Sequence, residues 1–271
     1  MLATAFGKGA SYKFAPFSFR VLFTTTLLFA GAPQYALGSA CEATKTGERA
    51  QVVYVYDGDT VKLDDGRRLR LIGINTPELG YRDQPTQPLA DTARQALLRL
   101  LEANNHTLLL QYEKQHHDHY GRLLAHAFLE DGENVAVQML QQGLATTLVV
   151  PPNIWGADCY QQFENAARHD RKGLWALPEY QPQSALSLPP ETRGFHIVQG
   201  RVSEIRNTRY TTWVEIEGPL VVQISRKDLT NFDPLEELIG KQVEIRGWLT
   251  QQGDELRVKI QHPAALIIIP G

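Results

Sequence analysis

Three short blocks of the chain gather side chains that suit phosphate chemistry. The first is Asp57-Gly58-Asp59-Thr60, the second runs from Arg70 to Glu78, and the third runs from Asp118 to Arg122. Arg70 lies inside an apolar strand pattern, where an unpaired guanidinium is costly, so we expect a carboxylate or an anionic ligand to face it. Together the blocks supply two arginines, a set of oxygen donors and a free glutamate.

Such a set is suited to phosphodiester hydrolysis. Guanidinium groups bind phosphate oxygens in pairs, an oxygen-ligated hard cation neutralises charge, and a carboxylate activates or positions water. The predicted oxygen donors are Asp59, Asn75 and Thr76, and the carboxylate is that of Glu78. Any one block alone would be weak evidence, because an Asp-Gly pair is most often a structural turn.

The elements that must position these blocks are short strands and amphipathic helices. Residues 51–63 and 67–74 read as strands broken by turns at Asp57-Gly58 and at residues 64–66. Later segments alternate between helical and strand patterns, with helices expected at Leu89–Glu102, Asn134–Gln142 and Ala157–His169 and strands at Thr107–Tyr112 and Leu123–Leu129. This order predicts an α+β domain built on a closed barrel.

A second, mostly β region follows a proline-rich stretch at residues 178–193. A short helix is expected around Pro234–Ile239, and five strands are expected at Phe195–Ile205, Thr212–Ile216, Leu220–Ile224, Gln242–Leu249 and Glu255–Ile260. Five short strands suit a partly open OB-like barrel, although a small sandwich gives a similar pattern. The predicted plan is therefore a signal peptide at 1–40, a first domain at 51–177, a linker at 178–193 and an accessory domain at 194–269.

Residues 1–40 have the character of a secretory signal peptide. They carry three basic side chains and no acidic one, and an apolar run over 21–32 precedes small residues that end at Ala40. The run is shorter than the roughly 20 residues that span a bilayer. Cleavage after Ala40 makes Cys41 the first residue, and lipid attachment to Cys41 or an uncleaved anchor are the competing interpretations. We expect a secreted or periplasmic protein.

Charge and cysteine content set further limits. The whole chain has 27 basic and 30 acidic residues; loss of the three leader cations leaves 24 and 30, a net charge of −6. The globally basic surface typical of nucleic-acid binders is absent from this composition. Cys41 and Cys159 are the two cysteines, and an oxidising compartment permits either a disulfide between them or two unpaired thiols.

Five ordered blocks between Gln51 and Trp175 resemble the staphylococcal nuclease (thermonuclease) family. They are Asp57 to Leu63, Arg70 to Glu78, Asp118 to Arg122, Gln142 to Ala145, and Arg171 to Trp175. The resemblance implies a five-stranded OB-type barrel with three helices. It also implies a calcium-dependent endonuclease that acts on DNA and RNA and leaves 3′-phosphate ends.

The resemblance also assigns roles to residues. It makes Arg70 and Arg122 the arginines that contact the phosphate and stabilise the pentacoordinate transition state. Glu78 becomes the general base or water-orienting carboxylate, and Tyr120 matches a tyrosine of the nucleotide pocket. The calcium site would consist of Asp59, Asn75 and the backbone carbonyl of Thr76.

Departures from the family pattern affect the metal and the nucleotide pocket. Asn75 stands where the family has a second aspartate, which removes one negative charge and predicts weaker calcium binding. The segment 148–152 lacks the pocket tyrosines of the best-known members, and His119 replaces a lysine. A noncatalytic protein that binds nucleic acid or another partner through a weakened site is therefore the rival hypothesis.

The aromatic and basic residues of the second region allow two interpretations. They could form a stacking platform for single-stranded nucleic acid, or the aromatics could pack the barrel while the arginines are merely exposed. The residues concerned are Arg206, Arg209, Tyr210, Trp213 and Trp248. Trp155 and Trp175 are expected to be packing residues.

Overall fold

The computed structural model describes residues 41–43, 47–80, 82 and 85–270. The predicted signal peptide at residues 1–40 lies outside the described residues. No described helix is long and apolar enough to cross a membrane.

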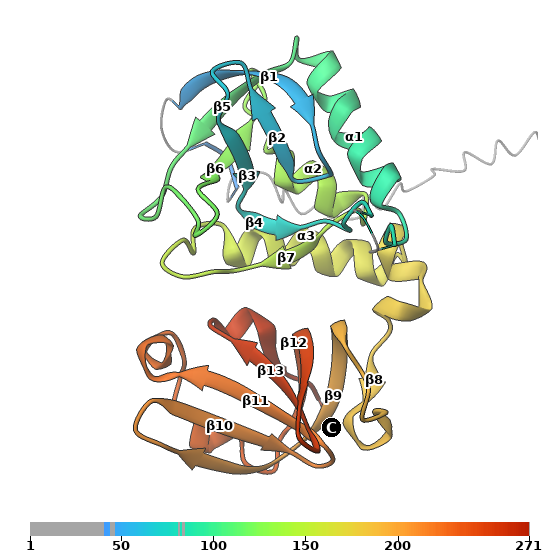
Figure 1. The fold of residues 1–271 in the computed structure, drawn as a ribbon, viewed down its shortest axis with the longest axis vertical. Helices are drawn as coiled ribbons and strands as arrows, with labels where there is room; N and C mark the ends of the chain where they lie inside the picture. The colour runs from blue at the N-terminus through green and yellow to red at the C-terminus, as the bar shows by residue number, and fades with distance from the viewer. Residues whose placement is uncertain (1–40, 44–46, 81, 83–84, 271) are drawn as a thin grey trace, which may run out of the picture. The chain divides into compact units, whose positions relative to one another are not determined.

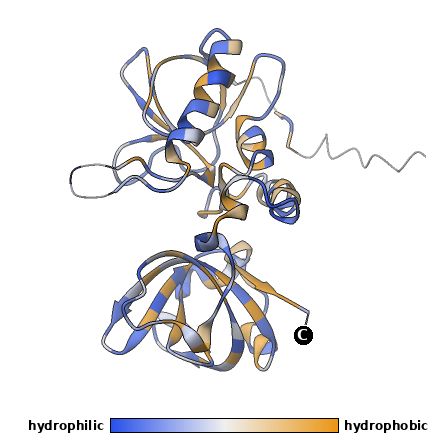
Figure 2. Ribbon diagram, turned by 90° about the vertical axis from the view of Figure 1, so that its right-hand side faces the viewer, coloured by the Kyte–Doolittle hydropathy of each residue, from blue (hydrophilic) through white to orange (hydrophobic). Residues whose placement is uncertain are grey.

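The first barrel is closed by five strands in the order β1-β2-β3-β6-β5 (Figure 1). These strands are β1 (Glu48–Val55), β2 (Thr60–Leu63), β3 (Arg68–Leu71), β5 (Thr107–Gln111) and β6 (Leu123–Phe128). Only β3 and β6 pair in parallel; the other neighbours are antiparallel. Strands β2 (TVKL) and β3 (RLRL) alternate between hydrophilic and hydrophobic residues, because successive side chains point to opposite faces, whereas β5 and β6 are mostly hydrophobic. Figure 2 shows hydrophobic and hydrophilic segments interleaved along the ribbon. This confirms the predicted closed barrel.

Three helices accompany this barrel, as predicted: α1 (Ala90–Ala103), α2 (Val135–Gln141) and α3 (Ala157–His169). The Asn134 side chain caps α2 by accepting a hydrogen bond of 2.9 Å from the amide of Ala136. The chain leaves α2 at Gly143, whose φ of 66° is in the left-handed region that favours glycine.

A two-stranded ladder beside the barrel was not expected from the sequence. Its strands are β4 (Gly73–Asn75) and β7 (Thr146–Leu148), which pair antiparallel with Asn75 opposite Thr146. Three residues are too few for a periodic hydrophobic signal, so only tertiary pairing defines these strands. Gly73 is needed in the ladder because its φ is 90° and a Cβ atom there would lie 2.2 Å from the Tyr160 ring.

The second barrel contains all five predicted strands: β9 (Gly194–Asn207), β10 (Thr211–Ile216), β11 (Leu220–Ser225), β12 (Gln242–Gln252) and β13 (Glu255–Ile260). Pairing runs β9-β10-β11-β13-β12 and returns to β9, so the ring is closed rather than partly open. Closure is possible because β9 pairs with β12 through residues 194–201 and with β10 through residues 202–207. The expected helix around Pro234–Ile239 is a single 3-10 turn at Leu235–Leu238.

Short elements complete the described chain. Strands β8 (Gln183–Ser184) and β14 (Leu266–Ile268) extend the second sheet by pairing with β9 and β12. Further 3-10 turns occupy Gly173–Ala176, Pro178–Tyr180, Ala185–Ser187, Arg226–Asn231 and Pro263–Ala265. The proline-rich stretch 178–193 thus contains β8 and two of these turns, and the domain boundaries proposed above stay predictions.

Buried ion pairs join α3 to strand β12. Both barrels belong to one compact unit of the chain. Arg246 on β12 lies 2.8 Å from Glu164, which is fully buried on α3, and 3.0 Å from Glu244. Arg168 on α3 donates two hydrogen bonds of 2.7 Å to the Glu244 carboxylate. Each buried charge therefore has an opposite partner, as the low dielectric of the interior requires.

A disulfide joins Cys41 to Cys159 at the start of α3, with a Cα–Cα distance of 5.9 Å. Both cysteines are buried, and the Asn134 side chain donates to the Cys41 carbonyl at 3.1 Å. The bond decides between the two states that the sequence left open. It also leaves no free Cys41 thiol for lipid attachment.

Removal of the disulfide should lower stability substantially. The bond joins cysteines that are 118 residues apart in the sequence. For a loop of that length, the loss of chain entropy in the unfolded state limits the stabilisation to about 5 kcal/mol. We expect the Cys41→Ser/Cys159→Ser variant to unfold at lower urea concentration, with at most about 5 kcal/mol lost. Equal denaturation midpoints for the oxidised wild type and this variant would contradict the structure.

The Glu244 ion pairs should make stability depend on pH. Burial opposes ionisation of Glu244, but the Arg168 hydrogen bonds and the Arg246 charge outweigh it and lower the pKa to about 2 from 4.5. The stabilisation is complete above pH 4.5 and is lost as the pH falls toward 2, a loss of about 3 kcal/mol.

Urea unfolding of wild type and Glu244→Gln at several pH values between 5 and 2 measures this effect. The variant should be less stable at pH 5 and should lose less stability than wild type as the pH falls. Glu215→Gln is the matched control, because Glu215 pairs with Arg206 on the surface and such pairs contribute about 1 kcal/mol or less. Parallel pH profiles for wild type and Glu244→Gln would refute the ion-pair account.

Candidate active site

A pocket of about 380 Å³ brings together four of the residues singled out in the sequence. Arg70, Asn75, Glu78 and Arg122 all line it. They come from β3, from β4, from the segment after β4 and from the entrance of β6. The parallel pairing of β3 with β6 places Arg70 opposite Leu124, two residues after Arg122, so barrel closure brings the two arginines to one site.

Arg70 is buried and held by three contacts. Its Nε atom lies 3.1 Å from Asp59, Nη1 donates to the Leu71 carbonyl at 2.5 Å, and Nη2 donates to the Asn75 side chain at 3.1 Å. The carboxylate predicted to face this arginine is therefore Asp59. A guanidinium has five N–H donors, so two remain for a phosphate in the pocket.

Asp59 forms the junction of the site and is only 1% exposed. Besides Arg70, its first carboxylate oxygen accepts from the Thr60 hydroxyl at 3.0 Å. Its second oxygen accepts from the backbone amide and the hydroxyl of Thr76, at 2.7 and 3.0 Å. Asp59 and Thr76 are not among the residues that line the pocket, and their hydrogen bonds fix the first block of the sequence against the second.

Glu78 is exposed at the pocket, and its backbone is held by Gln87. The Glu78 amide donates to the Gln87 side chain at 2.9 Å, and its carbonyl accepts from the Gln87 amide at 3.0 Å. Partial desolvation by the surrounding protein and the charge of Asp59 raise the pKa of Glu78, while Arg70 and Arg122 oppose the rise. A raised pKa brings a carboxylate closer to the range in which it accepts and releases protons near neutral pH.

Arg122 is positioned by Asp118, whose part the sequence did not reveal. The Asp118 carboxylate accepts from the amides of Tyr120 and Arg122, each at 2.9 Å, and from Arg122 Nε at 2.7 Å. Burial alone would raise the pKa of Asp118, but these hydrogen bonds and the Arg122 charge lower it. The turn thus holds an ionised carboxylate that orients the Arg122 guanidinium.

Asp57 is a second residue that sequence reasoning missed. Burial, the charge of Asp59 and the charge of Glu78 raise its pKa to about 7, while the Asp59 amide donates to it at 3.0 Å. Its place in the Asp-Gly-Asp turn was the available signal, but the turn alone did not distinguish a structural from a functional carboxylate. Three carboxylates therefore repel one another near the pocket.

The donor chemistry of this cluster fits a hard divalent cation. Asp57, Asp59, Asn75, Glu78 and the Thr76 carbonyl all offer oxygen, which is the ligand atom that calcium prefers. Burial and, after it, the charge of Asp59 raise the pKa values of Asp57 and Glu78, and a bound cation would oppose both effects. In the described part of the chain, however, no three His, Cys, Asp or Glu side chains form a ready metal cluster.

Several of these oxygens already accept hydrogen bonds. All four lone-pair sites of the Asp59 carboxylate have partners, and Asn75 accepts from Arg70 while donating to the Thr76 carbonyl at 3.3 Å. Coordination by Asp59 would require it to exchange a partner. This arrangement is consistent with the weaker binding expected from asparagine in place of aspartate.

Tyr120 lies outside the pocket lining. It is 74% exposed, its ring lies 3.7 Å from that of His119, and the Arg122 guanidinium lies 5.6 Å from its centroid. The other pocket wall is formed by Leu148, Val150 and Asn153. Asn153 joins that wall to the loop before Asp118 by two hydrogen bonds to the Gln115 backbone, at 2.9 and 2.8 Å.

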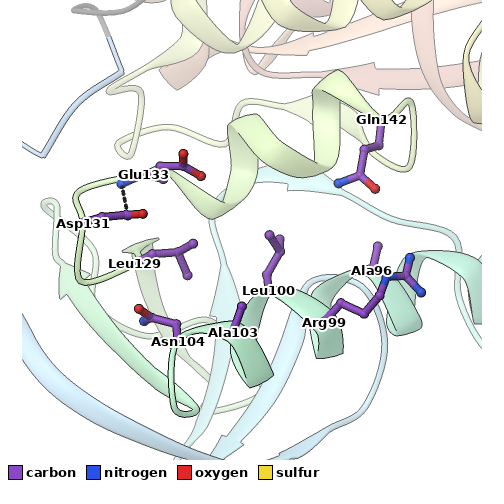
Figure 3. A pocket seen from close by; sticks show the side chains of 9 residues that line it. All are labelled: Ala96, Arg99, Leu100, Ala103, Asn104, Leu129, Asp131, Glu133 and Gln142. Atoms are coloured by element: carbon purple, nitrogen blue, oxygen red, sulfur yellow. Dashed lines mark hydrogen bonds between the residues drawn. The ribbon is translucent and has the colours of Figure 1, made fainter.

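Another pocket, of about 300 Å³, lies between α1, α2 and the turn after β6 (Figure 3). Its charged lining residues are Arg99, Asp131 and Glu133, and Asp131 accepts from the Glu133 amide at 2.9 Å. It contains none of the residues that the sequence analysis assigned to phosphate chemistry.

Comparison with known proteins identifies the family. Residues 68–177 match the staphylococcal nuclease homologue family. The thermonuclease of Staphylococcus intermedius is 35% identical over 132 residues, which cover 48% of this chain and 77% of that protein. The chain belongs to the staphylococcal nuclease family.

Other relatives agree with this membership. The thermonuclease of Staphylococcus hyicus is 34% identical over 129 residues, covering 46% of this chain and 75% of that protein. An uncharacterized endonuclease of Escherichia coli O157:H7 is 28% identical over 137 residues, which cover 46% of this chain and 76% of that protein. The family match contains Arg70, Glu78 and Arg122 and ends before the second barrel begins.

Proposed function

We propose that this staphylococcal nuclease homologue is an exported, calcium-dependent endonuclease that hydrolyses single-stranded DNA and RNA and leaves 3′-phosphate ends. The observation that carries the proposal is the convergence of Arg70, Arg122 and Glu78 on one pocket. Relatives named thermonuclease and endonuclease support the same activity.

In the proposed reaction, the two arginines bind the nonbridging oxygens of the scissile phosphate. Arg70 offers its two remaining N–H donors, and Arg122 approaches from the turn that Asp118 holds in place. Both cations stabilise the negative charge that grows on the phosphoryl oxygens in the transition state. Their fixed contacts with protein groups keep reorganisation small during the reaction.

Glu78 acts on the attacking water. Its carboxylate accepts a proton from the water as the water oxygen forms a bond to phosphorus. The bond between phosphorus and the 5′ oxygen breaks, and that oxygen takes up a proton, so the phosphate stays on the 3′ oxygen. The raised pKa of Glu78 makes the carboxylate a stronger base than an ordinary glutamate.

A calcium ion would be held by oxygens of Asp59, Asn75 and Thr76, with Asp57 nearby. When bound, it supplies positive charge that binds the phosphate and stabilises the transition state. The clustered carboxylates support this assignment because a cation relieves their mutual repulsion.

Export is supported by the leader-like residues 1–40 and by the disulfide between Cys41 and Cys159, a bond typical of oxidising compartments. The net charge of −6 expected without the leader means that binding depends on the local arginines and the cation rather than on a basic surface. Substrate affinity should therefore be modest and sensitive to salt.

The rival function is noncatalytic binding of nucleic acid or of another partner. The specific observation in its favour is Asn75, which lacks the charge of an aspartate and is already engaged by Arg70 and the Thr76 carbonyl. This hypothesis expects oligonucleotide binding without calcium binding at millimolar calcium.

Cleavage of single-stranded DNA tests the enzyme hypothesis directly. Wild type should cleave with calcium and stop with chelator, and Glu78→Gln should be slower by about 10²–10⁴-fold because it loses a general base. Glu191→Gln, at an exposed position of the 178–193 stretch, is the control and should cleave at the wild-type rate. Equal rates with calcium, with chelator and in Glu78→Gln would exclude the mechanism.

Substitution of Asn75 by aspartate tests the metal assignment. The added charge should tighten calcium binding by about tenfold or more, because a unit charge about 4 Å from a divalent cation contributes roughly 2 kcal/mol even in water. Without calcium, Asn75→Asp should unfold more easily than wild type, because it adds a fourth carboxylate and loses the hydrogen bond to the Thr76 carbonyl, which together outweigh the charge gained beside Arg70.

Calorimetric calcium titration and thermal unfolding measure the two effects. Asn207→Asp, on β9 of the second barrel, adds the same charge away from the pocket. It should change neither the calcium affinity nor the difference in unfolding temperature between samples with calcium and with chelator. Calcium affinity that is the same in wild type and Asn75→Asp would remove Asn75 from the metal site.

A further inference from the structure

Strand β12 extends beyond the contact between the barrels. Arg246 and Trp248 lie two residues apart and therefore on the same face of the strand. Arg246 is 8% exposed, because it is paired with Glu164 of α3, whereas Trp248 is 44% exposed. The contact with α3 thus covers Arg246 and leaves much of the indole of Trp248 open to solvent.

The Trp248 side chain is held by an aromatic neighbour. Phe195 lies directly opposite it on β9, with ring centroids 5.2 Å apart and an angle of 65° between the rings. Phe195 in turn lies 5.9 Å from Tyr180. The rings of Trp248 and Phe195 meet edge to face and are not stacked in parallel. The contact therefore orients the indole, and Phe195 does not lie parallel to the face of the indole.

A small cleft of about 40 Å³ separates these rings from the first barrel. Phe195 and Trp248 line one side, and Thr147, Leu148 and Val149 line the other. Leu148 also lines the catalytic pocket. The cleft and that pocket therefore meet at Leu148, the lining residue that they share.

We infer that Trp248 stacks on a base of a single-stranded nucleic acid whose neighbouring phosphate occupies the catalytic pocket. The inference rests on the proposed function and extends it to the second barrel. The segment at the end of β7 offers no aromatic side chain for stacking, since residues 148–152 are Leu-Val-Val-Pro-Pro. The exposed indole next to Leu148 supplies one, and aromatic stacking binds bases with little sequence preference.

Trp213 provides an internal comparison. It lies on β10, which does not pair with β12, and its ring is approached by the guanidinium groups of Arg206 at 5.9 Å and Arg257 at 4.8 Å. Trp213 lines neither the candidate active-site pocket nor the cleft beside Trp248. The two tryptophans therefore do not form one platform, and the inference concerns Trp248 alone.

Binding to a noncleaving form tests the inference. All variants are made in the full-length chain carrying Glu78→Gln, and the dissociation constant for a fluorescent oligothymidylate of about ten nucleotides is measured by anisotropy at low salt. Trp248→Ala should raise this constant by about tenfold, and Trp248→Phe should retain most of the affinity. Trp213→Ala should bind as the parent does. Thermal unfolding of each variant shows whether it is folded at the assay temperature.

Oligothymidylate cleavage by proteins that retain Glu78 separates this inference from the proposed function. A higher KM for Trp248→Ala with an unchanged kcat supports it, whereas unchanged binding and KM overturn it even if wild type is an active nuclease. An equal loss of affinity in Trp213→Ala, or loss in Trp248→Phe as large as in Trp248→Ala, also overturns it. If wild type does not cleave but binding still depends on Trp248, the enzyme proposal fails and the stacking surface stands.

Discussion

The buried contact between Arg70 and Asp59 is the interaction on which the site depends. Asp59 comes from the turn before β2 and Arg70 from β3, and the same carboxylate also holds the backbone of Thr76. An arginine inside an apolar strand is costly without a partner, and a buried aspartate is equally costly. Each charge therefore offsets the cost of burying the other. Through Asp59, the pair also fixes the Arg70 guanidinium relative to the segment that runs from Thr76 to Glu78.

Charge balance changes from one part of the molecule to another. In the ion pairs between α3 and β12, the carboxylates of Glu164 and Glu244 are matched by Arg168 and Arg246. Near the pocket, desolvation by burial and, after it, the charge of Asp59 raise the pKa values of Asp57 and Glu78. The first arrangement stabilises a buried contact, while the second leaves negative charge that a cation can neutralise. The net acidity of the chain therefore says little about where a phosphate can bind.

The role inferred for the second barrel depends on its position. Strand β12 carries both the buried Arg246 and the exposed Trp248 on the same face. The residue that is ion-paired to α3 and the residue proposed to contact substrate therefore lie two positions apart. The ion pairs of Arg168 and Arg246 hold β12 against α3 and so help to position the Trp248 ring beside β7. Through Trp248, the inference connects the second barrel with the reaction proposed for the first barrel.

The sequence determined the local elements and the chemical types of the site. Apolar runs bounded by turns located the five strands of each barrel, and helical spacing of apolar residues located the three helices. The residue types at Arg70, Glu78 and Arg122 indicated phosphate chemistry. Tertiary structure decided what no local pattern encodes: closure of the second barrel, the three-residue ladder of β4 and β7, and the Cys41–Cys159 bond. It also revealed Asp57, Asp118 and the placement of Trp248. The physical reason is that hydrophobic periodicity acts between neighbours in the chain, whereas a pKa, a salt bridge or a cleft depends on groups that only folding brings within a few ångströms.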